Sequence, residues 1–228
     1  MLFYWTKKAF RFMLKKMEKV RFFDLNMGNL PNDLPVFILP EVVLLPEGRL
    51  SIRITDIKQI ANVLRTLESG RIFALLPDDD KKQLQTGCAV RICGFSENED
   101  DSLNVSFVGV CRFKVETYFK KDAYDMVHVD YLPFMNDFDA GEMDNKPILL
   151  ASLKAYLKNK HIDIDVDLFL KMPSKKLLAT LVSVLPLDFI EKQAVLECAD
   201  FNRAIETLIA ILDLSSAGEK LAKGVQKC

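Results

Sequence analysis

Apolar and polar residues alternate along residues 102–117, which is the clearest pattern in the chain. The apolar side chains share the odd positions Leu103, Val105, Phe107, Cys111, Phe113 and Val115. Because successive side chains of a strand point to opposite faces, this alternation predicts a long strand with one buried face. Gly109 falls at an inward position within the run, and it predicts a bulge or sharp bend in the strand.

Shorter apolar runs on both sides of this segment predict further strands. They lie at residues 36–39, 42–45, 49–54, 72–76, 90–95 and 127–131. Asp56 is placed to cap a helix that runs to Gly70. Six or seven short strands with one early helix predict a small, partly open barrel over residues 27–135.

The apolar period becomes helical after the polar stretch 136–146. Apolar stripes with helical spacing cover residues 149–157, 177–185 and 201–212. Asp188 and Glu191 have the spacing of a capping box for one more helix, and Asp200 is a candidate cap for the last. We therefore predict a helical subdomain over 136–214 and a flexible tail over 215–228. Strands followed by helices indicate an α+β fold.

Charge is divided unevenly along the chain, although the formal net charge is only −1. Residues 1–26 carry a net charge of +5 and seven aromatic residues, whereas residues 27–228 carry −6. Three interpretations of 1–26 stay open: a secretory signal, an amphipathic helix on a membrane surface, or an extension upstream of the true start at Met17 or Met27. The secretory signal is the weakest, because basic residues interrupt its apolar run.

The cysteines give no sign of a metal site or a disulfide framework. The chain has five of them, an odd number, and none forms a C-x-x-C pair. This usage is typical of a reducing compartment, with buried cysteines acting as small apolar residues. We therefore expect a cytoplasmic protein. No stretch of about 18 uncharged apolar residues occurs, so the sequence predicts no transmembrane helix.

One run of possible metal ligands, a histidine followed by three aspartates, lies within residues 161–167. A calcium loop starting at Asp163 would need Gly at its sixth position and Glu at its twelfth. Those positions hold Leu168 and Ser174. The run therefore predicts solvated carboxylates and a cap before a short helix, and we expect no bound metal.

Signals of catalysis are also missing from the sequence. It contains neither a G-x-S-x-G nucleophile elbow nor a phosphate-binding P-loop, and only two histidines. His128 falls on the polar face of a predicted strand, which favours an ordinary surface role. We predict that the protein is not an enzyme and needs no cofactor.

Four stretches resemble the amino-terminal substrate-binding domain of the ATP-dependent Lon protease, in a short stand-alone bacterial form. They are Leu34–Pro40 with Val43–Gly48, Gly87–Ile92, Gly109–Val115, and Leu185–Asp188 continued by Glu191–Gln193, Leu196, Glu197, Asp200, Arg203 and Leu208. The match spans roughly residues 34–213. After Ile54 the family usually has an aromatic residue, an acid, a proline, a base and a tyrosine, but this chain has Thr55 to Gln59, which lacks the aromatic and proline character.

The resemblance implies a partly open, PUA-like pseudo-β-barrel with one helix, followed by a C-terminal helical bundle. In the full protease this domain helps to recognise unfolded or tagged polypeptides, and ATPase and Ser–Lys protease modules follow it. This chain has neither module, and the adjacent Ser174 and Lys175 are not that dyad. We therefore predict a non-enzymatic polypeptide-recognition module, serving as an adaptor or quality-control factor, with a protease or chaperone as a further partner.

The predicted peptide-binding residues lie in the opening strand pair, because an open barrel offers strand edges and apolar grooves to an extended chain. They are Phe37, Leu39, Val43 and Leu45. Core packing is the alternative for each of these apolar side chains.

Two other functions stay open at this point. The family's barrel is similar to that of RNA-modification accessory domains, so an RNA-binding accessory protein is one alternative. The acidic body opposes it, because neutralisation of phosphates supplies most of the affinity for nucleic acid. Only residues 1–26 have the charge for RNA or a membrane surface. A structural subunit of a larger complex is the other alternative.

Overall fold

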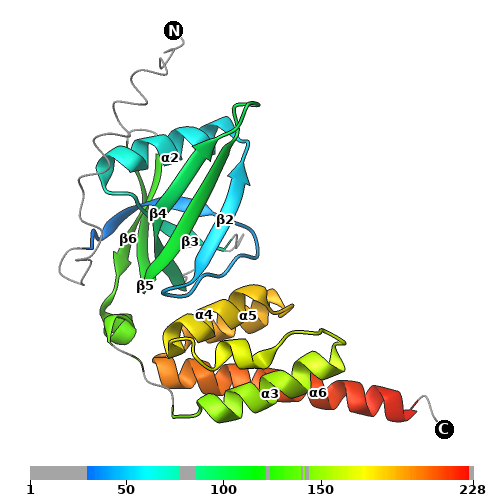
Figure 1. The fold of residues 1–228 in the computed structure, drawn as a ribbon. Helices are drawn as coiled ribbons and strands as arrows, with labels where there is room; N and C mark the ends of the chain where they lie inside the picture. The colour runs from blue at the N-terminus through cyan, green and yellow to red at the C-terminus, as the bar shows by residue number, and fades with distance from the viewer. Residues whose placement is uncertain (1–29, 78–85, 122–123, 140, 142–143, 226–228) are drawn as a thin grey trace. The chain divides into compact units, whose positions relative to one another are not determined.

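The structure is a computed structural model that describes residues 30–77, 86–121, 124–139, 141 and 144–225 (Figure 1). The basic aromatic segment 1–26, with its three interpretations, lies outside the described residues. A six-stranded sheet precedes a set of helices, which confirms the predicted α+β fold. The described residues from Pro31 onward form one compact unit.

The first half of the described chain contains all six strands and one α-helix. The elements are β1 (Asp33–Ile38), β2 (Arg49–Ile54), α2 (Ile57–Ser69), β3 (Ile72–Leu76), β4 (Thr86–Glu97), β5 (Leu103–Lys121) and β6 (Tyr124–Asp130). Helix α2 begins where predicted, because the Asp56 carboxylate accepts a hydrogen bond from the Gln59 amide at 2.8 Å. It ends at Gly70, whose φ of 133° suits glycine.

The strands close into an uneven ring. The order is β2-β5-β4-β3-β1-β6, and β6 also pairs with β5. The long strand β5 pairs with β4 on one side and, on the other, with β2 near its start and β6 near its end. Strand β1 is parallel to β3 and antiparallel to β6. The ring is therefore the predicted pseudo-barrel, only partly closed.

Aromatic side chains fill the interior of the ring. Phe37 of β1 lies 5.5 Å from Phe73 of β3 and 5.4 Å from Phe107 of β5, measured between ring centroids. All three are buried. The predicted alternation in β5 is confirmed, because its odd positions from Leu103 to Val115 are buried.

Gly109 lies at a bulge in β5, as predicted. Ala89 pairs with Cys111 and Val90 pairs with Gly109, so Val110 is the extra residue on β5. The close approach of another segment gives a second reason for glycine here. A Cβ atom at position 109 would lie only 2.1 Å from the carbonyl oxygen of Leu45.

The prediction of a strand at 42–45 is wrong, because these residues form no strand. They belong to a loop that turns after Leu39 and crosses β5 at Gly109. The Glu47 amide donates to the Gly109 carbonyl at 3.0 Å, and the Gly109 amide donates to the Gly48 carbonyl at 2.9 Å. These bonds to the bulge replace strand pairing.

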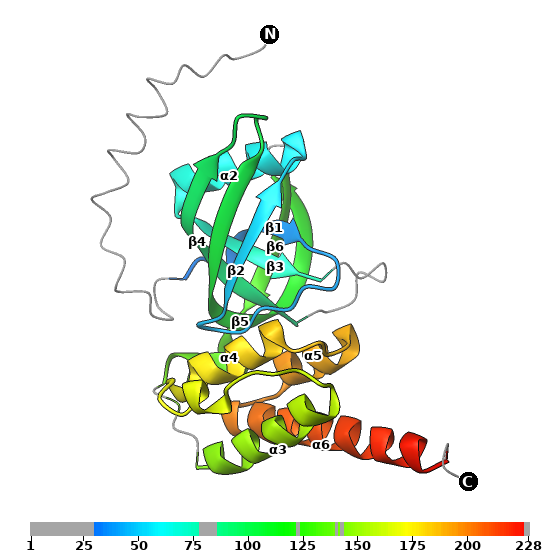
Figure 2. The same cartoon turned by 45° about the vertical axis from the view of Figure 1, so that its right-hand side comes forward.

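The second half of the described chain is helical. The elements are η2 (Leu132–Phe138), α3 (Lys146–Asn159), η3 (Val166–Phe169), α4 (Ser174–Val184), α5 (Phe189–Glu197) and α6 (Phe201–Val225). The predicted capping box of Asp188 and Glu191 is present at α5. Asp200 accepts from the Arg203 amide at 2.9 Å, as a cap of α6. Helices α3 and α6 pack side by side (Figure 2).

Helix α6 continues past Ser215, where we expected the chain to leave regular structure, and ends at Val225. Its contact with α3 explains the difference. Asn159 at the end of α3 donates its side-chain amide to the Ser216 carbonyl at 3.2 Å, and Ser216 is buried. A neighbouring helix therefore supports this small, polar turn.

Candidate peptide-binding groove

The residues predicted to bind a peptide are mostly inside the protein. Phe37 is 2% exposed in the aromatic interior of the ring. Val43 and Leu45 are buried with the apolar side chains of α3, α4, α5 and α6, and Leu39 is half-buried. Phe37, Val43 and Leu45 pack against other parts of the chain, and Leu45 also lines a small cavity of about 30 Å³ beside Arg112. A role for them in binding stays a prediction that would require the packing above them to open.

A groove does exist elsewhere, between α3 and the segment that follows it. Its volume is about 760 Å³. One wall comes from α3 and the other from residues 161–170, which we call the acidic strap. The lining residues on α3 are Leu150, Ala151, Lys154, Leu157 and Lys158, and those on the strap are His161 to Asp167 together with Leu170.

The acidic strap is held at both ends. The Ile162 amide donates to the Leu157 carbonyl at 2.9 Å, just after α3 ends. At the other end, the Lys146 ammonium donates to the carbonyls of Leu170 at 2.6 Å and Met172 at 2.7 Å. Hydrogen bonds therefore fix both ends of the strap to α3. The groove is preformed, which lowers the entropy cost of binding a ligand.

Apolar side chains of the strap divide between the core and the surface. Ile162 and Val166 pack against the helical core. Ile164 and Leu170 line the groove and stay 41% and 54% exposed, and the neighbouring Leu168 is 70% exposed. Exposed apolar side chains gathered on one surface are typical of an interaction site. This groove is therefore the candidate binding site of the described chain.

The sequence contains a signal for this site in residues 162–167. The strap alternates aspartates at 163, 165 and 167 with apolar residues at 162, 164 and 166. The metal-site interpretation of this run overlooks its alternating apolar residues. The predicted cap is confirmed, since Asp165 accepts from the Asp167 amide at 3.0 Å and begins η3. Among the described residues, no three His, Cys, Asp or Glu side chains are grouped to hold a metal.

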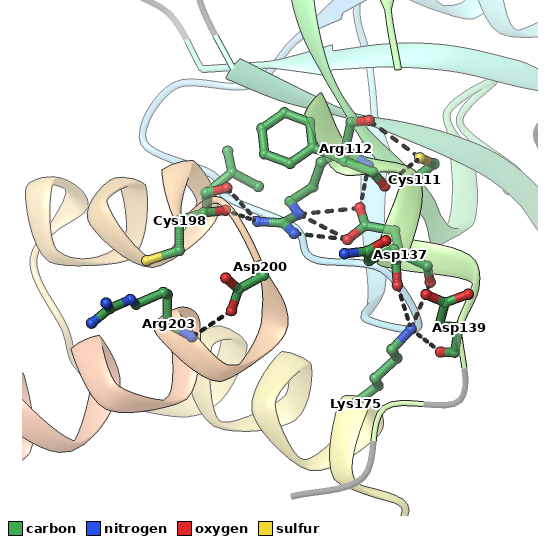
Figure 3. Close-up of polar contacts among 11 residues, drawn as sticks. Cys111, Arg112, Asp137, Asp139, Lys175, Cys198, Asp200 and Arg203 are labelled. Carbon is green, nitrogen blue, oxygen red and sulfur yellow. Dashed lines mark hydrogen bonds and ion pairs between the residues drawn. The ribbon is translucent and has the colours of Figure 1, made fainter. Parts of the chain in front are cut away.

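A buried ion pair joins the strands to the helices (Figure 3). The Arg112 guanidinium of β5 pairs with the Asp137 carboxylate of η2 at 2.8 Å, and both side chains are buried. Arg112 also donates to the carbonyls of Leu196 at 3.1 Å and Cys198 at 2.6 Å. Its guanidinium lies 4.4 Å from the centre of the Phe134 ring.

Lys175 of α4 strengthens the same junction from the helical side (Figure 3). Its ammonium donates to the carbonyls of Asn136 at 3.1 Å and Asp137 at 2.8 Å, and to that of Asp139. Charged donors bound to several acceptors are satisfied without solvent. Lys175 therefore has a structural role, as does Arg112.

Comparison with known proteins identifies the family. The sequence model described as the ATP-dependent protease La (LON) substrate-binding domain matches residues 33–213. The chain belongs to this family. No curated protein matches the chain.

Two solved structures have the same fold as this Lon substrate-binding domain. The Lon N-terminal domain protein from Xanthomonas campestris aligns with a TM-score of 0.59 and 21% identity, covering 79% of this chain and 98% of that one. The N-terminal domain of the Mycobacterium avium complex Lon protease aligns with a TM-score of 0.61 and 19% identity, covering 81% and 98%. The family supports a polypeptide-recognition module without catalytic residues of its own.

The cysteines of the domain divide by location. Cys88 and Cys111 are buried, whereas Cys198 is partly exposed and Cys93 is exposed. Burial raises the pKa of the Cys88 thiol, and burial beside Asp137 raises that of Cys111 to about 12. Both buried thiols therefore stay protonated, and they pack as small apolar groups, as predicted. Cys228 lies outside the described residues.

His128 lies on the outer face of the ring between two carboxylates. Its Nδ1 atom is 2.6 Å from Asp33 of β1, and its Nε2 atom is 3.6 Å from Glu116 of β5. The hydrogen bond with Asp33 is the main cause that raises the pKa of His128.

No helix among the described residues combines the length and apolar character that a membrane span needs.

Proposed function

We propose that this protein is an adaptor or quality-control factor that binds exposed apolar segments of unfolded polypeptides in the groove of α3 and the acidic strap. Family membership supports a polypeptide as the ligand. The observation that carries the choice of surface is the preformed groove with exposed Ile164 and Leu170. A protease or chaperone that receives the bound chain is part of this proposal.

The groove is a better candidate than Phe37, Leu39, Val43 and Leu45 because its apolar atoms reach solvent without any rearrangement. Burial of that surface by a ligand gives a favourable free energy of about 25 cal/mol per Å². A peptide that bound at Val43 or Leu45 would first have to separate them from the helical core. The free cysteines favour a cytoplasmic setting for this activity.

Nucleic acid is a poor match for the same groove. Three aspartates on the strap would repel phosphates, whereas only two of the α3 lysines line the groove and would attract them. An RNA-binding role and a role as a structural subunit stay predictions that no feature of the groove favours.

Filling the groove tests this proposal. Ala151 and Ala155 are both exposed on α3, but only Ala151 lines the groove. We expect the full chain to bind a labelled, unfolded peptide rich in Leu and Phe and free of charged residues. Ala151→Trp should weaken its affinity about tenfold or more by occupying the apolar wall, and Ala155→Trp should leave it unchanged. The readout is fluorescence anisotropy.

Two outcomes would overturn the proposal. One is that the wild-type chain binds the peptide no better than an unrelated acidic globular protein. The other is that both tryptophan variants, shown to be folded by circular dichroism, bind as the wild type does.

A further inference from the structure

The charged side chains of the groove are arranged by wall. Lys154 and Lys158 line the α3 side, and the exposed Asp163, Asp165 and Asp167 line the strap side. Among the described residues, no ion pair joins the two lysines to the three aspartates. The charges of both walls are therefore available to a bound chain.

The two walls do not attract charged ligands with equal strength. Lys158 is in the last turn of α3. The partial negative charge of the helix C-terminus offsets part of its positive charge. The strap has three carboxylates, and the one hydrogen bond that their oxygens accept within the described chain comes from the Asp167 amide to Asp165. The negative wall is thus the stronger one.

The body of the protein outside the basic residues 1–26 adds to this preference. Residues 27–228 carry a net charge of −6. Such a field attracts basic chains and repels acidic ones over a distance of about 10 Å at moderate salt. The strap therefore has the same sign of charge as the acidic body to which it belongs.

We infer that the groove selects unfolded segments in which Lys or Arg residues flank the apolar residues. The apolar side chains would contact Ile164 and Leu170, and the basic side chains would reach Asp163, Asp165 and Asp167. This inference rests on the proposed function, since it names the class of polypeptide that the groove accepts. The charges of the strap would determine which segments the groove prefers more than how tightly it binds them.

Three peptides with one apolar core test the inference with the full chain: flanks of Lys, of Gln and of Glu. We expect the affinity to decrease from Lys to Gln to Glu, with about a tenfold difference between Lys and Glu, the sum of a few weak exposed ion pairs. The difference should shrink in about 0.3 M salt, because exposed charges are screened.

A triple variant locates the effect. Asp163→Asn, Asp165→Asn and Asp167→Asn together remove the strap charges, and asparagine can keep the cap at position 165. The matched control is Glu97→Gln with Glu99→Gln and Asp101→Asn, which removes three exposed charges around the β4–β5 turn. The preference for Lys should disappear in the strap variant and persist in the control.

The outcomes separate this inference from the proposed function. Equal affinity for the Lys and Glu peptides, with the Gln peptide still bound, would overturn the inference alone. An equal loss of preference in the strap variant and the control would also overturn it, since the net charge and not the groove would then select. Failure to bind even the Gln peptide would overturn both.

Discussion

Residues 37–45 and residues 162–170 are both short, apolar-rich stretches, yet the structure covers most of the large apolar side chains in the first and leaves several exposed in the second. In the first stretch, Phe37, Val43 and Leu45 are buried against strands or helices, and Ile38 is the exposed exception. In the second, Ile164, Leu168 and Leu170 remain exposed beside a groove. Residue type does not separate the two stretches. What separates them is whether another element packs over the apolar side chains.

Truncating one apolar side chain in each stretch is the strongest way to break this comparison. Phe37→Ala should lower the free energy of unfolding by about 3–5 kcal/mol, because it leaves a cavity among Phe73 and Phe107. Leu168→Ala should change it by no more than about 0.5 kcal/mol, since that side chain is exposed. Denaturant titration measures both. Similar losses in the two variants would mean that the strap is part of the core.

Replacing Arg112 tests the buried junction between the strands and the helices, which pack on Val43 and Leu45. Arg112→Met should lower the free energy of unfolding by about 3 kcal/mol or more, because it leaves the Asp137 carboxylate buried without its partner. Arg53→Met is the control, since Arg53 forms an exposed pair with Asp100 and its loss should have a much smaller effect. Equal effects in denaturant titrations would contradict a buried junction.

Adding a methyl group at position 109 tests the close contact between β5 and the loop that contains Leu45. Gly109→Ala should cost about 1–3 kcal/mol, because the new Cβ atom would collide with the Leu45 carbonyl. Gly94→Ala is the matched control on β4, where the nearest atom to the new Cβ would be 3.9 Å away. We expect that control to match the wild type in thermal melting. A neutral Gly109→Ala would show that the loop moves away from β5 without cost.

The pair of Asp33 and His128 gives the smallest predicted effect on stability, and this effect depends on pH. The hydrogen bond with Asp33 raises the pKa of His128 above its unfolded value of about 6.5. The protonated pair therefore contributes its full stability below about pH 6.5, and this contribution is lost as the pH rises through the folded pKa. The gap in melting temperature between wild type and His128→Gln should be wider at about pH 5.5 than at about pH 8.5. A gap that grows with pH would contradict the assignment.

The sequence was sufficient for the elements whose signals are local. Alternation predicted β5, and the caps at Asp56, Asp188 and Asp200 predicted where three helices begin. A strand was wrongly predicted at 42–45 because the loop that contains these residues bonds through Glu47 and Gly48 to Gly109, far away in the chain. The length of α6 was missed because α3 supports it at Ser216. Both errors come from tertiary contacts that no local pattern encodes.

The candidate site was harder to predict than the fold, for the same reason. The aspartates of the strap stood out in the sequence, but nothing there showed that Lys146 and Leu157 would fix the strap beside α3. Only that placement turns an alternating run into the wall of a groove. Conversely, Phe37 has the residue type of a binding site but lies inside the ring.

Hydrogen–deuterium exchange of the full chain, with and without a saturating unfolded apolar peptide, compares the two stretches in one experiment. If the groove binds the peptide, exchange should slow in fragments that cover α3 and the strap, and fragments that cover 37–45 should not change. Slower exchange confined to 37–45, with none at α3 or the strap, would contradict the assignment of the groove and favour Phe37, Leu39, Val43 and Leu45 as the binding residues.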